Sequence, residues 1–296
     1  MPESEINGSE DNSLQEPLAF PRPRKEKKAE IRITYYTDPV CMWSFAFEPH
    51  WIRLIENLAH QINFDVKMGG LVYPGTSSPY TAKESAMALK NEIQDKTGVS
   101  ISPALWEKHQ LQSSYPACIS FYSSIDESFA KRVKFLRRLR QEYLLRGNYF
   151  MIESDFFEIL KSSKIDLERF HHYWKSGIAY REFLIDLASN NAQGIHSFPT
   201  LKISRPGQSP VFFHGFHNFY RIQHILSSAF PELVWIPLPD FEYILSFYQP
   251  LTAYEIVQLF DLTPETLRAF LKAEKITPKT KTVNGIKLFY HPETVI

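Results

Sequence analysis

Cysteine is scarce in this sequence: there are two in 296 residues, Cys41 and Cys118. So small a number excludes a fold that depends on several disulfide bonds. In a reducing compartment each thiol is free or takes part in redox chemistry. The ten histidines lack the spacing with cysteine partners that a structural metal site needs. We therefore expect no bound metal.

Long apolar runs and an excess of one charge are also missing. The apolar runs are far shorter than the ~20 residues of a membrane helix, and the N-terminus has no signal-peptide core. Lys and Arg number 33 and Asp and Glu number 33, so the formal net charge is zero and no global field points to nucleic acid or a membrane. We expect a cytoplasmic protein with no membrane partner.

The first 29 residues lack the composition of a folded segment. Residues 1–20 carry five acidic side chains and no Lys or Arg, and residues 22–28 hold five bases among prolines. Such a polar leader cannot bury enough apolar surface to offset its ordering entropy. We predict a disordered leader over residues 1–29.

A strand, a turn and a helix follow, with a thiol where the helix begins. The β-rich run 31–36 is cut off by Asp38-Pro39, a helical pattern covers 41–60, and a second strand covers 62–68. Unpaired N–H groups and the helix dipole meet at Cys41, and such sites lower a cysteine pKa from ~8.5 to roughly 3.5–7.5. Cys41 is therefore the candidate nucleophile, and Pro49 should kink its helix.

The rest of the chain predicts an α/β domain over residues 30–230 with a large helical insertion at about 75–193. Strand patterns return at 198–203 and 211–214, and a helix at about 217–229 closes the domain. Residues 231–250 look like a linker with one short helix. In 251–296, two helices and a hairpin around Asn284-Gly285 give the outline of a small winged helix-turn-helix-like module.

Two basic stretches are candidate binding surfaces. The pattern of 131–140 predicts a solvated helix face, with an anionic partner as the alternative. The C-terminal module has six bases and five acids, a net of +1, whereas DNA-binding domains usually have a much stronger basic footprint. We favour a protein-contact module over a nucleic-acid partner.

Several motifs together resemble the DsbA family of thioredoxin-fold proteins, in particular its cytosolic branch, over about residues 31–230. They are Asp38-Pro39-Val40-Cys41-Met42-Trp43, Phe47-Glu48-Pro49, Met68-Gly69-Gly70-Leu71, Ser113-Ser114-Tyr115-Pro116-Ala117-Cys118 and Phe198-Pro199-Thr200-Leu201. The resemblance implies a thioredoxin fold and a cis peptide at Phe198-Pro199. It also implies that the backbone beside this bond faces Cys41 and pairs with an extended substrate.

The sequence departs from the family at Ser44. Fully redox-active members have a second cysteine three residues after the first, because that thiol resolves the mixed disulfide. Here Cys41 could begin an exchange, but an outside thiol would have to end it. This predicts a monothiol oxidoreductase of the DsbA type that works on protein thiols or disulfides, with glutathione as a possible co-substrate and no tightly bound cofactor.

Two other functions stay open. The first is a non-redox adaptor that holds another protein by an extended segment, as some cytosolic relatives do when they present substrates to a protease. The second is a glutathione transferase or isomerase like the kappa class, which carries serine at the active position.

Around Cys41 we assign the following roles. Ser44 would hydrogen-bond the thiolate, Met42 and Trp43 would shape the substrate face, and Phe198-Pro199 would present backbone to the substrate. His196 would be a solvent-exposed loop histidine, or it would tune the thiolate or act as a general base. Cys118 would be a packing residue or a second thiol that faces Cys41, since the start of its helix borders the active site in relatives.

Overall fold

The structure is a computed structural model, and it describes residues 30–295. The predicted leader, 1–29, lies outside the described residues.

A four-stranded sheet carries the first part of the fold. Its order is β2-β1-β3-β4, with β1 and β2 parallel and the other pairs antiparallel. The strands are β1 (Arg32–Thr37), β2 (Asn63–Met68), β3 (Thr200–Ser204) and β4 (Val211–His214). Helix α1 (Met42–Leu58) joins the two parallel strands, and α9 (Phe219–Ala229) follows β4. This is the thioredoxin arrangement that the motifs implied.

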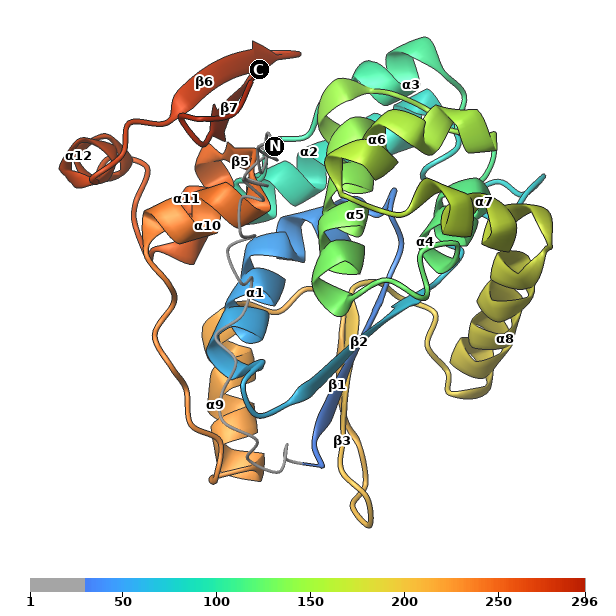
Figure 1. Ribbon diagram of the computed structural model, residues 1–296, viewed down its shortest axis with the longest axis horizontal. Coiled ribbons are helices and arrows are strands. Elements are labelled where there is room, and N and C mark those ends of the chain that lie inside the picture. Colours follow the sequence, from blue (N-terminus) through green and yellow to red (C-terminus); the bar gives the residue numbers. More distant parts are fainter. Residues whose placement is uncertain (1–29, 296) are drawn as a thin grey trace, which may run out of the picture.

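A helical lobe is inserted between β2 and β3, and Figure 1 shows most of it above and to the right of the sheet. Its helices are α2 (Lys83–Thr97), α3 (Ala104–Lys108), α4 (Tyr115–Tyr122), α5 (Phe129–Gln141), α6 (Phe157–Ser162), α7 (Leu167–Lys175) and α8 (Ile178–Ala192). A π-helical turn, η1 (Glu142–Arg146), and a 3-10 turn, η2 (Glu153–Phe156), connect α5 to α6. The basic helix expected at 131–140 is thus α5, which continues into η1.

The C-terminal elements lie against α1, at the upper left of Figure 1. They are α10 (Phe241–Tyr248), β5 (Leu251–Thr252), α11 (Ala253–Leu259), α12 (Leu267–Ala273), β6 (Lys279–Val283) and β7 (Ile286–Tyr290). The sheet order is β5-β7-β6, and the turn residues Asn284 and Gly285 have φ of 48° and 80°. Helix α12 begins at Leu267, after a turn in which Thr263 Oγ1 accepts the Thr266 N–H at 3.3 Å. Naming these elements a winged helix-turn-helix module stays a prediction.

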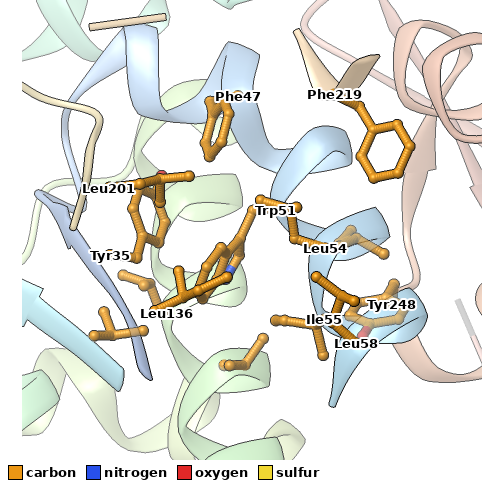
Figure 2. Close-up of a cluster of buried hydrophobic side chains, with 14 of the residues drawn as sticks. Tyr35, Phe47, Trp51, Leu54, Ile55, Leu58, Leu136, Leu201, Phe219 and Tyr248 are labelled. Carbon is orange, nitrogen blue, oxygen red and sulfur yellow. The ribbon is translucent and has the colours of Figure 1, made fainter. Parts of the chain in front are cut away.

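One hydrophobic core joins the sheet, α1 and the C-terminal elements. In Figure 2, Tyr248 of α10 lies beside Ile55 and Leu58 of α1, and Trp51 lies between α1 and the strand that carries Tyr35. Helix α10 falls in the segment 231–250, which was predicted to be a linker with one short helix. Its side chains belong to the same buried cluster as those of the sheet.

The prediction that the basic stretch 131–140 forms a solvated face is wrong for two of its arginines. Arg137 and Arg140 are 2% and 1% exposed. Arg140 pairs with Glu48 of α1, and Arg137 pairs with Glu255 of α11 at 2.5 Å. Acidic partners far away in the sequence make burial of these charges tolerable.

Candidate thiol site

Cys41 is the N-cap residue of α1, as the sequence predicts. Its backbone N–H donates to the Asp38 carbonyl at 3.1 Å, and its Sγ accepts the Ser44 N–H at 3.4 Å. The Asp38-Pro39 turn thus delivers the sulfur to the first turn of the helix, where N–H groups have no intrahelical partner.

The thiol is covered, because only 1% of Cys41 is exposed. The Tyr80 hydroxyl donates to Sγ at 3.8 Å, and Sγ donates to the Phe198 carbonyl at 3.6 Å. Tyr80 is held in turn by Trp106, whose Nε1 donates to the Tyr80 carbonyl at 2.8 Å. Sequence reasoning missed Tyr80, which lies in an irregular loop with no motif around it.

Phe198 reaches this position because Gly69 has no side chain. The Phe198-Pro199 peptide is cis, and the Phe198 ring lies on the Cα of Gly69: a Cβ there would be 1.9 Å from the ring. The motif Met68-Gly69-Gly70-Leu71 therefore has a physical role beside the thiol.

Burial raises the pKa of the Cys41 thiol above its usual value, and the nearby Asp38 carboxylate raises it further. Hydrogen bonds from Ser44 and Tyr80 oppose this shift. The expectation of a lowered pKa at Cys41 is therefore wrong. The helix N-terminus is present, but desolvation outweighs it.

The hydrogen bond that joins Ser44 to the Cys41 sulfur in this geometry comes from the Ser44 backbone N–H. The Ser44 Oγ is buried and has no hydrogen-bond partner within residues 30–295.

Cys118 lies in α4, directed at Asp38. Its Sγ donates to Asp38 Oδ2 at 3.3 Å, and Ser114 Oγ and the Leu71 N–H donate to the same oxygen, each at 2.7 Å. Both cysteines are free. Burial and the Asp38 charge raise the pKa of Cys118 well above its usual value. The structure thus gives Cys118 a hydrogen-bond partner other than Cys41, and a role as second thiol stays a prediction. Asp38 and Ser114 both belong to motifs of the sequence, but the sequence alone did not assign either of them a role in the site.

A groove of about 470 Å³ lies beside the thiol. Its lining residues are Trp43, Lys96, Thr97, Ser197, Phe198, Gly215 and Phe216. Trp43 contacts Phe216 at a ring distance of 6.0 Å, and Lys96 Nζ lies 5.8 Å from the Trp43 ring. Trp43 and Phe198 are therefore placed to contact a bound segment.

Two predicted site residues lie elsewhere. Met42 is fully buried and packs in the core of the helical lobe, so its predicted place on the substrate face is wrong. Because α1 turns by about 100° per residue, Met42 points inward while Trp43 faces the groove. His196 is exposed on the loop before Phe198, and no hydrogen bond joins it to the thiol in the described part of the chain.

Residues 30–295 contain neither a candidate metal site nor a candidate membrane-spanning helix. No group of three His, Cys, Asp or Glu side chains could hold a metal ion there. No helix among these residues has the length and apolar character to cross a bilayer.

Comparison with known proteins gives the same fold. The thioredoxin family model matches residues 35–215, which is more than half of the chain. Two curated relatives are named ClpXP adapter protein SpxH. The one from Halalkalibacterium halodurans is 19% identical over 274 residues, covering 88% of each chain, and the one from Bacillus cereus is 23% identical over 286 residues, covering 90% of this chain and 92% of its own.

Two solved structures show the fold. A Nitrosomonas europaea structure assigned as a protein disulfide isomerase has a TM-score of 0.59 at 17% identity, covering 68% of this chain and 98% of its own. The cytosolic disulfide reductase DsbM of Pseudomonas aeruginosa has a TM-score of 0.52 at 15% identity, covering 81% and 97%. The chain belongs to the thioredoxin family, and a helical lobe is inserted between β2 and β3 of its fold.

Proposed function

We propose that this protein is an adaptor that binds another protein through the groove beside Cys41 and presents it to a ClpXP-type protease. The observation that carries this proposal is the closed state of the thiol. Cys41 lies beneath Tyr80 and the Phe198 carbonyl, burial raises its pKa, and position 44 holds a serine. A neutral, covered sulfur without a resolving thiol at that position is poorly suited to rapid disulfide exchange.

The extent of the curated matches supports the same function. The two relatives named as ClpXP adapters match 88% and 90% of this chain. Residues 1–230 make up less than that share, so the matches extend into the C-terminal elements. By contrast, the thioredoxin family model ends at residue 215.

The groove offers what an extended segment needs. Trp43, Phe198 and Phe216 supply apolar contact area, and aromatic residues dominate the binding energy of many protein interfaces. A partner segment could also pair with backbone next to the Phe198-Pro199 bond, as the family resemblance implies. The adaptor thus uses the substrate site of a DsbA-type protein without its redox step.

Thiol exchange is the second candidate, and the hydrogen bond from the Ser44 N–H to Cys41 Sγ favours it. Once deprotonated, the Cys41 thiolate would attack a partner disulfide and form a mixed disulfide while the other partner sulfur leaves as a thiolate. An external thiol such as glutathione would then attack that bond, release Cys41 and stay attached to the partner. The DsbM neighbour has also been solved with glutathione.

The experiment separates the adaptor function from thiol exchange, because only thiol exchange needs the Cys41 sulfur. Partners are captured with the tagged wild-type chain and with Cys41→Ala, and each captured protein is then degraded by purified ClpXP with and without the adaptor. We expect both chains to capture the same protein and to accelerate its degradation equally. Trp43→Ala should weaken binding about tenfold or more, as loss of an interface hot spot does.

Tyr220→Ala, an exposed aromatic residue on α9, is the control for Trp43→Ala and should leave degradation unchanged. If acceleration requires Cys41 and a partner disulfide, the adaptor proposal fails and thiol exchange takes its place. Failure of the wild-type chain to accelerate degradation would also refute the adaptor proposal.

A further inference from the structure

Arg140 of α5 reaches the turn that carries the thiol. We call residues 37–44 the thiol turn, since they run from the end of β1 into the first turn of α1. The Arg140 Nη2 donates to Thr37 Oγ1 and, at 3.3 Å, to the Tyr35 hydroxyl. The Tyr35 hydroxyl donates in turn to the Ser44 carbonyl at 3.4 Å. One guanidinium is therefore joined to both ends of the thiol turn.

These contacts lie in the interior of the protein. Thr37, Tyr35 and Ser44 are fully buried, and so is the guanidinium itself. A hydrogen bond from a charged donor is stronger in such surroundings, because water does not compete for the acceptor. If Arg140 withdrew, no water could take its place at the two hydroxyl oxygens, and their desolvation would remain as a cost.

Glu48 keeps the guanidinium charged. Its carboxylate pairs with Arg140 Nη1, which leaves Nη2 for the thiol turn. Burial alone would lower the pKa of Arg140. Its interactions with Glu48, Tyr35 and Cys41 outweigh burial and raise the pKa above its usual value. A permanent positive charge thus lies within electrostatic reach of the sulfur.

Arg137, one turn earlier in α5, makes a different set of contacts. It lies 3.8 Å from the same Glu48 and 2.5 Å from Glu255. Its other donors bind backbone carbonyls in the segment 248–250 of the C-terminal elements. The two arginines are similarly buried and share one carboxylate, so the contacts with the thiol turn are what distinguishes Arg140.

We propose that Arg140 is a positioning residue of the thiol site, which holds the thiol turn in place so that Cys41 stays covered. The turn also carries Trp43, so its position sets the groove as well as the sulfur. A lysine could keep the ion pair with Glu48, but only a guanidinium has a fixed fork of donors for three acceptors at once. This role goes beyond the adaptor function and does not depend on it.

The test measures the rate at which iodoacetamide alkylates Cys41 in the full chain, with the alkylated peptide quantified by mass spectrometry. Because the covered thiol must open to react, the rate reports local opening of the thiol turn. Arg140→Lys keeps the charge but loses the contacts with Thr37 and Tyr35, so Cys41 should react about tenfold faster.

Arg137→Lys is the matched control, because it makes the same change in a similarly buried arginine that does not contact the thiol turn. It should leave the rate unchanged. Urea unfolding of both variants checks that each chain is folded under the conditions of the reaction. The proposal is overturned if the two variants alter the rate equally, or if Arg140→Lys reacts no faster than the wild type.

Thr37→Val tests the same contact from the other side without changing a charge. It should also accelerate alkylation, and the double variant with Arg140→Lys should react no faster than Arg140→Lys alone, since both changes break one contact. Effects that add would mean a general loosening of the core and would overturn the proposal. If Arg140→Lys does not fold, Thr37→Val decides, because an unchanged rate in that variant contradicts the proposal by itself.

Discussion

Two buried polar regions contain residues from the N-terminal half of α1 or from the turn before it, and they differ in how buried charge is compensated. The first region, which we call the junction, lies where α1 and α5 meet the C-terminal elements. It consists of four side chains that are nearly inaccessible to solvent: Arg137, Arg140, Glu48 and Glu255. Arg137 lies between the two acids, 2.5 Å from Glu255 and 3.8 Å from Glu48. Two positive and two negative charges are thus buried together.

At the thiol site, the Asp38 carboxylate is buried with hydrogen-bond donors but without a cation. Val40 and Leu71 donate N–H groups to it, and Ser114 and Cys118 donate from side chains. Burial raises the pKa of Asp38, and that of Cys41 as well. The two regions therefore differ in what compensates burial: opposite charges pair at the junction, whereas hydrogen-bond donors surround Asp38 at the thiol site.

The largest expected effect comes from breaking the junction. Arg137→Met leaves Glu255 buried without its partner and removes hydrogen bonds to the carbonyls of Tyr248 and Pro250. Removal of one member of a buried ion pair typically costs about 3–5 kcal/mol of unfolding free energy. Urea unfolding followed by circular dichroism measures this loss as a lower midpoint at an unchanged slope.

Lys161→Met is the control for Arg137→Met, since it breaks the exposed pair with Glu158. Exposed pairs contribute about 0–1 kcal/mol. Equal losses in the two variants would show that the buried charges do not hold the junction together.

The next effect concerns two buried titratable groups of α1, Glu56 and His50, whose pKa values burial shifts in opposite directions. Burial raises the pKa of Glu56 to about 7, although Tyr248 donates to it, and burial lowers the pKa of His50 to about 4. Because its pKa is raised in the folded state, Glu56 adds to the free energy of unfolding below pH 4.5, and this contribution is lost as the pH rises toward 7. Because its pKa is lowered in the folded state, His50 adds to the free energy of unfolding above pH 6.5, and this contribution is lost as the pH falls toward 4.

Because the two slopes oppose each other between pH 4.5 and 6.5, they largely cancel in the wild type. In Glu56→Gln only the His50 contribution remains, so the free energy of unfolding should rise with pH over this window. In His50→Gln only the Glu56 contribution remains, so the free energy of unfolding should fall. Each removed contribution is roughly 3 kcal/mol across its whole range, at 1.36 kcal/mol per pKa unit. Urea unfolding at intervals from pH 4.5 to 7.5 measures the slopes, and parallel curves for all three chains would contradict the assignment.

The sequence could predict the position of the thiol because local signals determine it. Asp38-Pro39 ends a strand, and Cys41 begins the helix that follows, so the turn and the N-cap follow from a few neighbouring residues. The Asn284-Gly285 hairpin is another local feature, and the structure has it where the dipeptide predicts. The resemblance to a known family added the Phe198-Pro199 loop, which lies far from Cys41 in the sequence.

The burial of particular side chains could not be predicted in the same way. Arg137 and Arg140 look like surface residues of a basic helix until Glu48 and Glu255, from two distant segments, are placed beside them. Likewise, burial raises the pKa of Cys41, and one of the residues that covers the sulfur is Tyr80, from a loop nearly forty residues away. Both depend on tertiary packing, which a periodicity or a motif does not record.

The smallest expected effect tests whether a hydrogen bond between the C-terminal elements and α1 restrains the opening of Cys41. Pro49 has no N–H, so the carbonyl of Phe45 lacks its helical donor, and the Tyr254 hydroxyl donates to the next carbonyl, Ala46, at 2.7 Å. Loss of this bond in Tyr254→Phe should cost about 1 kcal/mol, which is roughly a fivefold change in a local opening equilibrium. Cys41 must open to react, so we expect iodoacetamide to alkylate it about fivefold faster in a Cys118→Ala background.

Tyr290→Phe separates this coupling from a general loosening of the C-terminal elements. It also removes one hydroxyl from these elements, but that hydroxyl contacts Arg146 of η1 rather than α1. If the bond to Ala46 restrains the first turns of α1, only Tyr254→Phe accelerates alkylation, and both variants keep similar urea midpoints. Equal acceleration in both would mean that the C-terminal elements open as one body, and no acceleration in either would mean that Cys41 is covered by Tyr80 and Phe198 alone.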